Sequence, residues 1–235
     1  MLQLQTRILQ LAWPIMLSNI TVPLLGLVDT AVLGHLDDVS YLGAVALGSQ
    51  VVTLLLWSFG FLRMGTTSLS AHATGAGETN TTERILQNAL LMALMISFPL
   101  MVFAFFSIES IIALIGGSPV VQALAVEYVN IRLMATPAVL VQYVLIGWFI
   151  GRGETKVPLM LLIISNSINA LLDVVLVYGC GLTSDGVAWA TLCADYSAAS
   201  LGLYWAMRTL GKINKAHRSP LLWPNWQELK PLVNI

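Results

Sequence analysis

The sequence predicts an all-helical polytopic membrane protein, a bundle of six transmembrane helices. Hydrophobic residues make up 57% of the 235 residues and charged residues only 10%, whereas an ordinary soluble domain has about 25% charged residues. The mean hydropathy is +0.81. Long apolar runs alternate with short polar breaks, and each run is long enough to cross roughly 30 Å of hydrocarbon at about 1.5 Å per residue.

The six helices are expected where apolar runs lie between breaks rich in turn-forming or charged residues. The first run is too long for the apolar core of a signal peptide, so we expect it to remain in the protein. The breaks are, in order, HLDDVSY, TGAGETNTTER, IGGSP, GRGETK and CGLTSD. The predicted helices cover residues 9–34, 43–71, 85–106, 121–150, 157–179 and 186–208. Residues 1–211 then form the transmembrane lobe and residues 212–235 a cytoplasmic amphipathic linker.

Lysine and arginine predict the orientation of the helices. Apart from Arg63 and Arg132, which fall within predicted helices, they lie before the first helix, at the second and fourth connections, and after the sixth helix; the first, third and fifth connections contain none. By the positive-inside rule both termini are expected in the cytoplasm, with the lobe in the cell (inner or plasma) membrane. In the tail, Trp223, Trp226, Leu229 and Leu232 recur at helical spacing, which predicts a short helix on the membrane surface.

A polar stripe runs along the fifth predicted helix. Asn166, Asn169 and Asp173 stand at positions i, i+3 and i+7, so they share one helix face. A charge at the bilayer centre costs roughly 2.5–3.5 kcal/mol on insertion scales. Such a stripe must therefore face other helices or a water-filled cavity rather than lipid.

Three predicted helices bring polar side chains to the same depth. Asp29 lies six residues before His35, at the outer end of the first helix, and Asp173 lies six residues before Gly179, at the outer end of the fifth. Both carboxyls are therefore roughly 9 Å below the outer boundary by helical rise. Thr191 is five residues into the returning sixth helix. This coincidence predicts a cluster of Asp29, Asn169, Asp173 and Thr191.

The predicted cluster suits the exchange of a cation. Burial and like charge both favour the protonated form of a carboxyl, so at least one of the two acids is expected to hold a proton near neutral pH. The same oxygens also suit Na⁺. A site that exchanges H⁺ or Na⁺ is what a secondary transporter needs. The alternative is a structural hydrogen-bond network in which one acid is permanently neutral.

Other kinds of site are not indicated by the sequence. No nucleophile–base pair stands out, the three histidines are scattered, and GRGETK lacks the G-x-x-x-x-G-K-[ST] pattern of a phosphate loop. We therefore expect no enzyme activity, no cofactor and no metal beyond Na⁺ at the predicted cluster. The sequence has no basic face of the kind that binds nucleic acid. Cys180 and Cys193 are expected to be ordinary thiols, with a disulfide between them as the alternative.

Three segments carry a resemblance to a known family. WPIMLSNITVPLLGLVDTAVLGHL is similar to the first helix of the multidrug and toxic compound extrusion (MATE) family, in its DinF-like branch. GRGETKVPL resembles that family's link between helices 4 and 5, and LLDVVLVYGCGLTSDGVAWAT its passage from helix 5 to helix 6. MATE transporters have twelve helices in two lobes. The resemblance therefore implies an N-terminal six-helix lobe, with a second lobe in the same longer chain or in another subunit.

The resemblance implies secondary active transport. The family exports drugs and other xenobiotic or toxic organic compounds by antiport against H⁺ or Na⁺. Residue by residue, it assigns the cation site to Asp29, Asn169, Asp173 and Thr191, and the hinge of the first helix to Pro14. Substrate would lie on polar faces of the lobe, for which the candidate lining residues are Asn166, Gln142 and Tyr143.

Three alternatives remain open from the sequence. A lipid-linked oligosaccharide flippase of a related fold is expected to have a more cationic cavity than Arg63 and Arg132 supply. A membrane enzyme acting on lipid would need a catalytic constellation that the sequence does not contain. A non-transporting or half-size membrane subunit is expected if the 235 residues are the whole native product.

Overall fold

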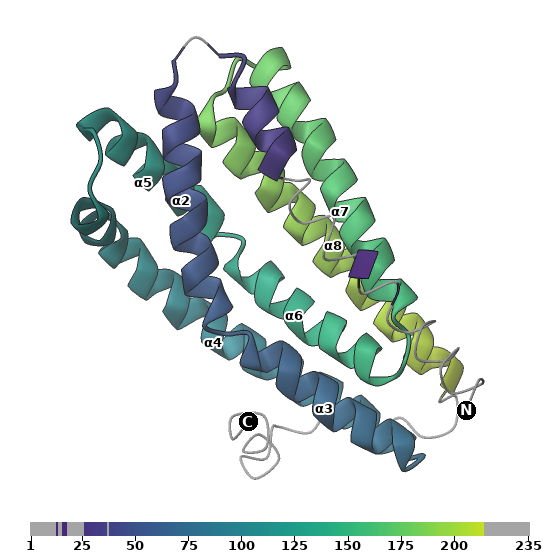
Figure 1. The fold of residues 1–235 in the computed structure, drawn as a ribbon. Helices are drawn as coiled ribbons and strands as arrows, with labels where there is room; N and C mark the ends of the chain where they lie inside the picture. Colours follow the sequence, from purple (N-terminus) through teal and green to yellow (C-terminus); the bar gives the residue numbers. More distant parts are fainter. Residues whose placement is uncertain (1–12, 14–15, 18–25, 37, 214–235) are drawn as a thin grey trace.

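The computed structural model describes residues 13, 16–17, 26–36 and 38–213 (Figure 1). Within them every regular element is a helix. Residues 26–33 form a helix that we call helix 26–33. It is followed by α2 (Ser40–Trp57), α3 (Phe61–Gly75), α4 (Thr79–Ile115), α5 (Pro119–Leu133), α6 (Thr136–Gly151), α7 (Lys156–Val174), the π-helical turn η1 (Val175–Gly179) and α8 (Ser184–Ile213). Pro14 and the predicted linker beyond residue 213 lie outside the described residues.

The helices pack mainly in pairs. In Figure 1, α3 lies beside α6, α2 beside α5, and α7 beside α8. Among the described residues, α2, α4 and the combined segment α7–η1 are each long and apolar enough to cross a membrane. The pair α5 and α6 passes the same test together, although it is bent by 53°. The chain is thus an all-helical membrane bundle.

Two of the predicted helices are broken in the structure. The range predicted as 43–71 is divided into α2 and α3 by a turn at residues 58–60. The range predicted as 121–150 is divided into α5 and α6. Here Pro137, in the first turn of α6, has no backbone N–H to donate. The carbonyl of Leu133 accepts a hydrogen bond from the Thr136 hydroxyl instead, at 2.6 Å.

Helix α4 is longer than predicted. It has 37 residues and continues through Pro99, where residues 85–106 were expected. It ends at Gly116, whose φ of 92° favours glycine. The next helix starts at once, because the Ser118 hydroxyl accepts a hydrogen bond from Val121 N and Pro119 occupies the first turn. A tight turn therefore joins α4 to α5.

Two glycines allow α6 to lie directly against α3. A Cβ atom on Gly147 would lie 2.5 Å from the Arg63 carbonyl oxygen, and one on Gly151 would lie 2.6 Å from that of Thr67. Beside them, the indole Nε1 of Trp148 donates to the Thr82 carbonyl at 3.0 Å. Because Trp148 is fully buried, this bond fixes α6 against the first turn of α4.

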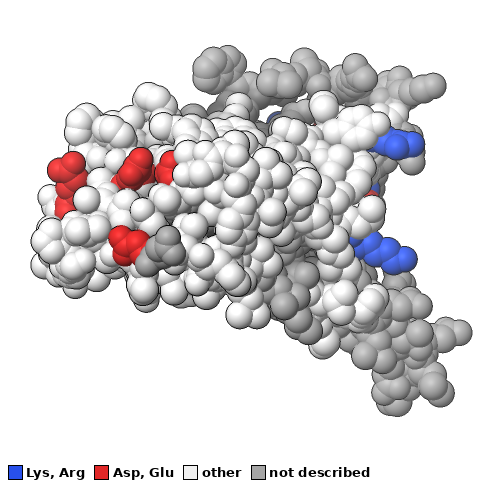
Figure 2. Space-filling view, turned by 90° about the horizontal axis from the view of Figure 1, so that it is seen from above, with Lys and Arg blue, Asp and Glu red and all other residues white. Residues whose placement is uncertain are grey.

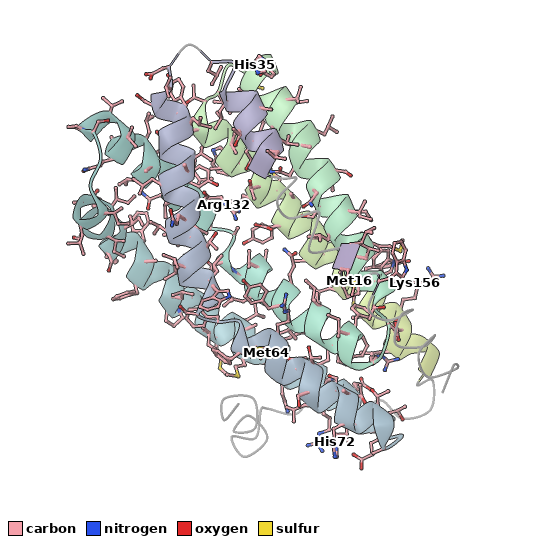
Figure 3. The ribbon with its side chains drawn as sticks, in the orientation of Figure 1. Met16, His35, Met64, His72, Arg132 and Lys156 are labelled. Atoms are coloured by element: carbon pink, nitrogen blue, oxygen red, sulfur yellow. The ribbon has the colours of Figure 1, made fainter. Side chains whose placement is uncertain are left out.

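On one face of the bundle, the two ends differ in the charge of their exposed side chains. Figure 2 shows acidic side chains at one end of this face and basic side chains at the other. At the acidic end, Asp38 precedes α2, and the Ser40 N–H donates to its carboxylate at 2.8 Å. This hydrogen bond holds the pKa of Asp38 below its usual value. Figure 3 labels His35 and Lys156 at opposite ends of the molecule.

Candidate functional site

The side chains of Asp29 and Asp173 lie together. Asp29 belongs to helix 26–33, and Asp173 is in the last turn of α7. Their carboxyl groups are close enough to form a hydrogen bond when one of them carries a proton. Asp173 has no solvent-exposed surface. The structure thus places two acids from different helices in one buried position.

Asn169 on α7 and Thr191 on α8 form a second pair, one helical turn of α7 from the acid pair. Asn169 is one helical turn before Asp173 and is 1% exposed. Its Nδ2 donates to the Thr191 hydroxyl at 3.0 Å, and that hydroxyl donates to the Val187 carbonyl at 2.9 Å. Since the Thr191 hydroxyl gives its only proton to Val187, it can only accept from Asn169, which directs the amide nitrogen toward Thr191. We call Asp29, Asn169, Asp173 and Thr191 the acid-pair site.

The acid-pair site is rich in oxygen atoms that receive no hydrogen bond. Asp29 Oδ1, Asn169 Oδ1 and both carboxyl oxygens of Asp173 are buried and have no hydrogen-bond partner. Buried acceptors of this kind are costly unless a donor or a cation satisfies them. A proton shared between the acids, or a small hard cation bound by carboxyl and amide oxygens, would do so.

The described residues contain no group of three or more His, Cys, Asp or Glu side chains that could hold a metal ion. A Na⁺ ion at the acid-pair site would therefore also need the neutral oxygens of Asn169 and Thr191. Cys180 and Cys193 are free thiols, so the disulfide considered from the sequence does not form.

A second polar group lies beside the acid-pair site. Arg132 Nη1 and Asp195 Oδ2 form an ion pair at 2.8 Å, with side chains only 12% and 16% exposed. Gln142 Nε2 donates to the Asp195 backbone carbonyl at 3.0 Å. Tyr128, which is buried, interacts electrostatically with Arg132. Figure 3 labels Arg132 between the two ends of the bundle.

The two polar groups are connected. Arg132 interacts electrostatically with Asp29, and Asp195 follows Thr191 by four residues on α8, which places the two on one helix face. Sequence reasoning missed Asp195. The available signal was its position one turn after Thr191 in an apolar helix, where an acid needs a partner.

The remaining predicted residues are divided between the two groups. Gln142 contacts Asp195, and Tyr143, half-buried, interacts electrostatically with Arg63 and Asp195. Neither has a described contact with the acid pair. Asn166 lies on α7, three residues before Asn169, and is half-buried.

Comparisons with known proteins identify the family of the chain. The sequence model of the MatE family matches residues 14–175. DNA damage-inducible protein F of Escherichia coli (strain K12) is 41% identical over 200 residues, covering 85% of this chain and 44% of that protein. A probable multidrug resistance protein NorM of Thermotoga maritima is 24% identical, covering 99% of this chain and 50% of that protein.

Solved structures share the fold. A MOP superfamily transporter from Pyrococcus furiosus superposes with a TM-score of 0.87 at 21% identity, covering 97% of this chain and 50% of that one. The outward-facing conformation of a multidrug resistance MATE family transporter gives a TM-score of 0.87 at 22% identity, with the same coverage. The chain thus spans about half the length of the relatives that it matches.

Proposed function

Because the chain belongs to the MatE family, a family of transporters rather than enzymes, we propose that it is one lobe of a cation-coupled antiporter. The antiporter exports drugs or other toxic organic compounds. The second lobe belongs to the same longer chain or to another subunit, and substrate binds between the lobes. The relatives are about twice as long as this chain, which supports a partner lobe.

The acid-pair site carries this proposal. Two carboxyls from different helices meet in a buried position, and four of the oxygens there receive no hydrogen bond. H⁺ or Na⁺ satisfies these oxygens and holds helix 26–33 against α7. When the cation leaves, the two carboxylates repel each other and the helices separate. A ligand that favours one packing over another shifts the population between them, which is how the cation gradient would drive export.

The same proposal assigns the residues that line the substrate cavity and the hinge of the first helix. Gln142, Tyr143 and Asn166 line the part of the substrate cavity that belongs to this lobe, and Pro14 is the hinge of the first helix. Both termini are cytoplasmic. The separation of acidic and basic side chains between the two ends (Figure 2) supports this orientation, because basic residues gather on the cytoplasmic side.

The test is replacement of each acid in the intact protein, reconstituted into lipid vesicles. Asp29→Asn and Asp173→Asn should each abolish export of a fluorescent organic cation driven by an imposed ion gradient, because an amide cannot exchange a proton or balance Na⁺. Asp38→Asn, which changes an exposed acid in a connecting segment, should leave export unchanged. Running the assay with either an H⁺ or a Na⁺ gradient identifies the coupling ion. Unchanged export in both single mutants would rule out the proposed site.

A further inference from the structure

Helix α7 changes from α-helical to π-helical geometry within two residues of Asp173. It ends at Val174 and continues as the π-helical turn η1, in which Cys180 N donates to the carbonyl of Val175, five residues earlier, at 3.1 Å. The π-helix is rare in proteins, and single turns of it are frequently found at functional sites. Here the turn contains a residue whose side chain forms a hydrogen bond to helix 26–33.

That residue is Tyr178, whose hydroxyl donates to the Val32 carbonyl at 2.9 Å. Asp173 contacts the same helix through Asp29. In a regular α-helix, residues five apart point about 140° away from each other around the axis. Asp173 and Tyr178 are five residues apart, so a regular helix would not bring both to one neighbour. The wider π turn accounts for their common direction.

The Val32 carbonyl needs this donor. It is one of the last four carbonyls of helix 26–33, which have no partner within a helix. The other three are satisfied locally. Gly34 N donates to the Thr30 carbonyl at 2.8 Å and Leu36 N to that of Leu33 at 3.0 Å; the carbonyl of Ala31 accepts from the His35 ring at 2.6 Å.

Only the Val32 carbonyl, among these four, receives its donor from a distant part of the described chain. Val32 is 6% exposed and Leu33 1%, whereas Ala31 and Gly34 are exposed, so this end of the helix is shielded from water on the side of Val32 and Leu33. A carbonyl left without a donor there carries the cost of an unmade hydrogen bond. The Tyr178 ring, in contrast, is 51% exposed, so its main contribution to this contact is the hydroxyl.

We propose that Tyr178 is a positioning residue for Asp29. Its hydroxyl holds the end of helix 26–33 on α7 in the packing in which Asp29 and Asp173 meet. The consequence for cation binding rests on the function proposed above, whereas the effect on the helix does not. Because cation binding needs this packing, a smaller population of it lowers the apparent affinity for the cation and leaves the rate at saturation nearly unchanged.

The test compares two tyrosines that make the same kind of bond. Tyr178→Phe removes the bond to Val32. Tyr196→Phe removes a bond from α8 to the Met134 carbonyl, also 2.9 Å long, which lies at the α5–α6 break and not on helix 26–33. In the intact reconstituted protein, amide hydrogen exchange should become faster in peptides covering residues 26–36 for Tyr178→Phe only. The half-saturating concentration of the coupling cation should rise about 2- to 10-fold, the effect expected of one neutral hydrogen bond.

Unchanged exchange in residues 26–36 of Tyr178→Phe, or an equal change in Tyr196→Phe, would overturn the proposal. So would a loss of maximal export rate without a change in half-saturation. The two proposals fail separately. If Asp29→Asn and Asp173→Asn still couple export to the ion gradient, the proposed cation site is wrong, but faster exchange in Tyr178→Phe still establishes the positioning contact.

Discussion

Arg132 and Asp195 stand out among individual residues because both are charged, buried and paired at 2.8 Å. Removal of one partner from a buried ion pair is strongly destabilising, since the remaining charge has no compensation. Replacement of both partners by uncharged groups costs much less. The pair also carries the positive charge that interacts with Asp29, so its integrity affects the acid-pair site.

We therefore predict that replacing these two residues has strongly non-additive effects on the free energy of unfolding. Arg132→Met or Asp195→Asn alone should lower the free energy of unfolding by about 3–5 kcal/mol. The double variant should be more stable than either single variant, because it leaves no uncompensated charge. Thermal or denaturant unfolding of the protein in detergent measures this. Losses that simply add in the double variant would mean that the two side chains do not depend on each other.

Some residues of the two polar groups can be predicted from the sequence and others cannot, for physical reasons. Counting helical rise from the helix ends was enough to suggest that Asp29, Asn169, Asp173 and Thr191 share a depth. The structure pairs Asp29 with Asp173 and Asn169 with Thr191, on neighbouring turns of α7. Asp195 and Tyr178 were missed. Asp195 meets Arg132 next to the α5–α6 break, and Tyr178 lies in a π turn. Neither local geometry follows from a pattern of apolar residues.

Among the elements, the contact between α3 and α6 depends on the absence of side chains. Cβ atoms at Gly147 and Gly151 would lie 2.5 Å and 2.6 Å from backbone carbonyl oxygens of α3. No atom lies within 4 Å of the corresponding position at Gly75, the last residue of α3. Replacement of glycine by alanine should therefore destabilise the protein at Gly147 and Gly151 but not at Gly75.

We predict that Gly147→Ala and Gly151→Ala each destabilise the protein by about 1–3 kcal/mol, because overpacking forces the two helices apart. Gly75→Ala should be neutral or stabilise it by up to about 1 kcal/mol, since alanine restricts the unfolded chain and favours the helix. Melting temperatures of the three variants measured side by side test this. Equal effects at all three positions would mean that the close approach of α3 and α6 is not what requires glycine.

Apolar periodicity predicts where helices lie better than where they break. The segments 43–71 and 121–150 are predominantly apolar on both sides of their breaks, and hydropathy does not register a turn inside such a run. Pro137 is visible in the sequence, but proline in a membrane helix is compatible with either a mild bend or a break. The 53° bend depends on the surrounding contacts, such as the bond from Tyr196 on α8 to the Met134 carbonyl.

For the whole molecule, the orientation in the membrane can be tested with its own cysteines. Cys180 is exposed and follows η1, in the connection between α7 and α8 that the positive-inside rule places outside the cell. Lys156, at the other end of α7, is also exposed. Reagents that do not cross membranes should distinguish the two ends.

In a Cys193→Ala background, a membrane-impermeant maleimide should label Cys180 in intact cells, or in spheroplasts if an outer membrane surrounds them. In a variant that lacks both native cysteines, Lys156→Cys should be labelled only after permeabilisation. The extent of labelling on a gel or by mass spectrometry measures both. The reverse pattern would place the termini outside the cytoplasm and contradict the proposed orientation.

The length of α4 links the lobe to the thickness of its bilayer. Its 37 residues extend about 55 Å at 1.5 Å per residue, more than the roughly 40–45 Å of a bilayer with its headgroups. Hydrophobic mismatch is relieved by tilting, so thinner membranes would incline α4 further. Through the Trp148–Thr82 bond, α6 would incline with it, and the α5–α6 bend would change its angle. The acyl-chain length of the surrounding lipid would thus act on the polar interior of the lobe.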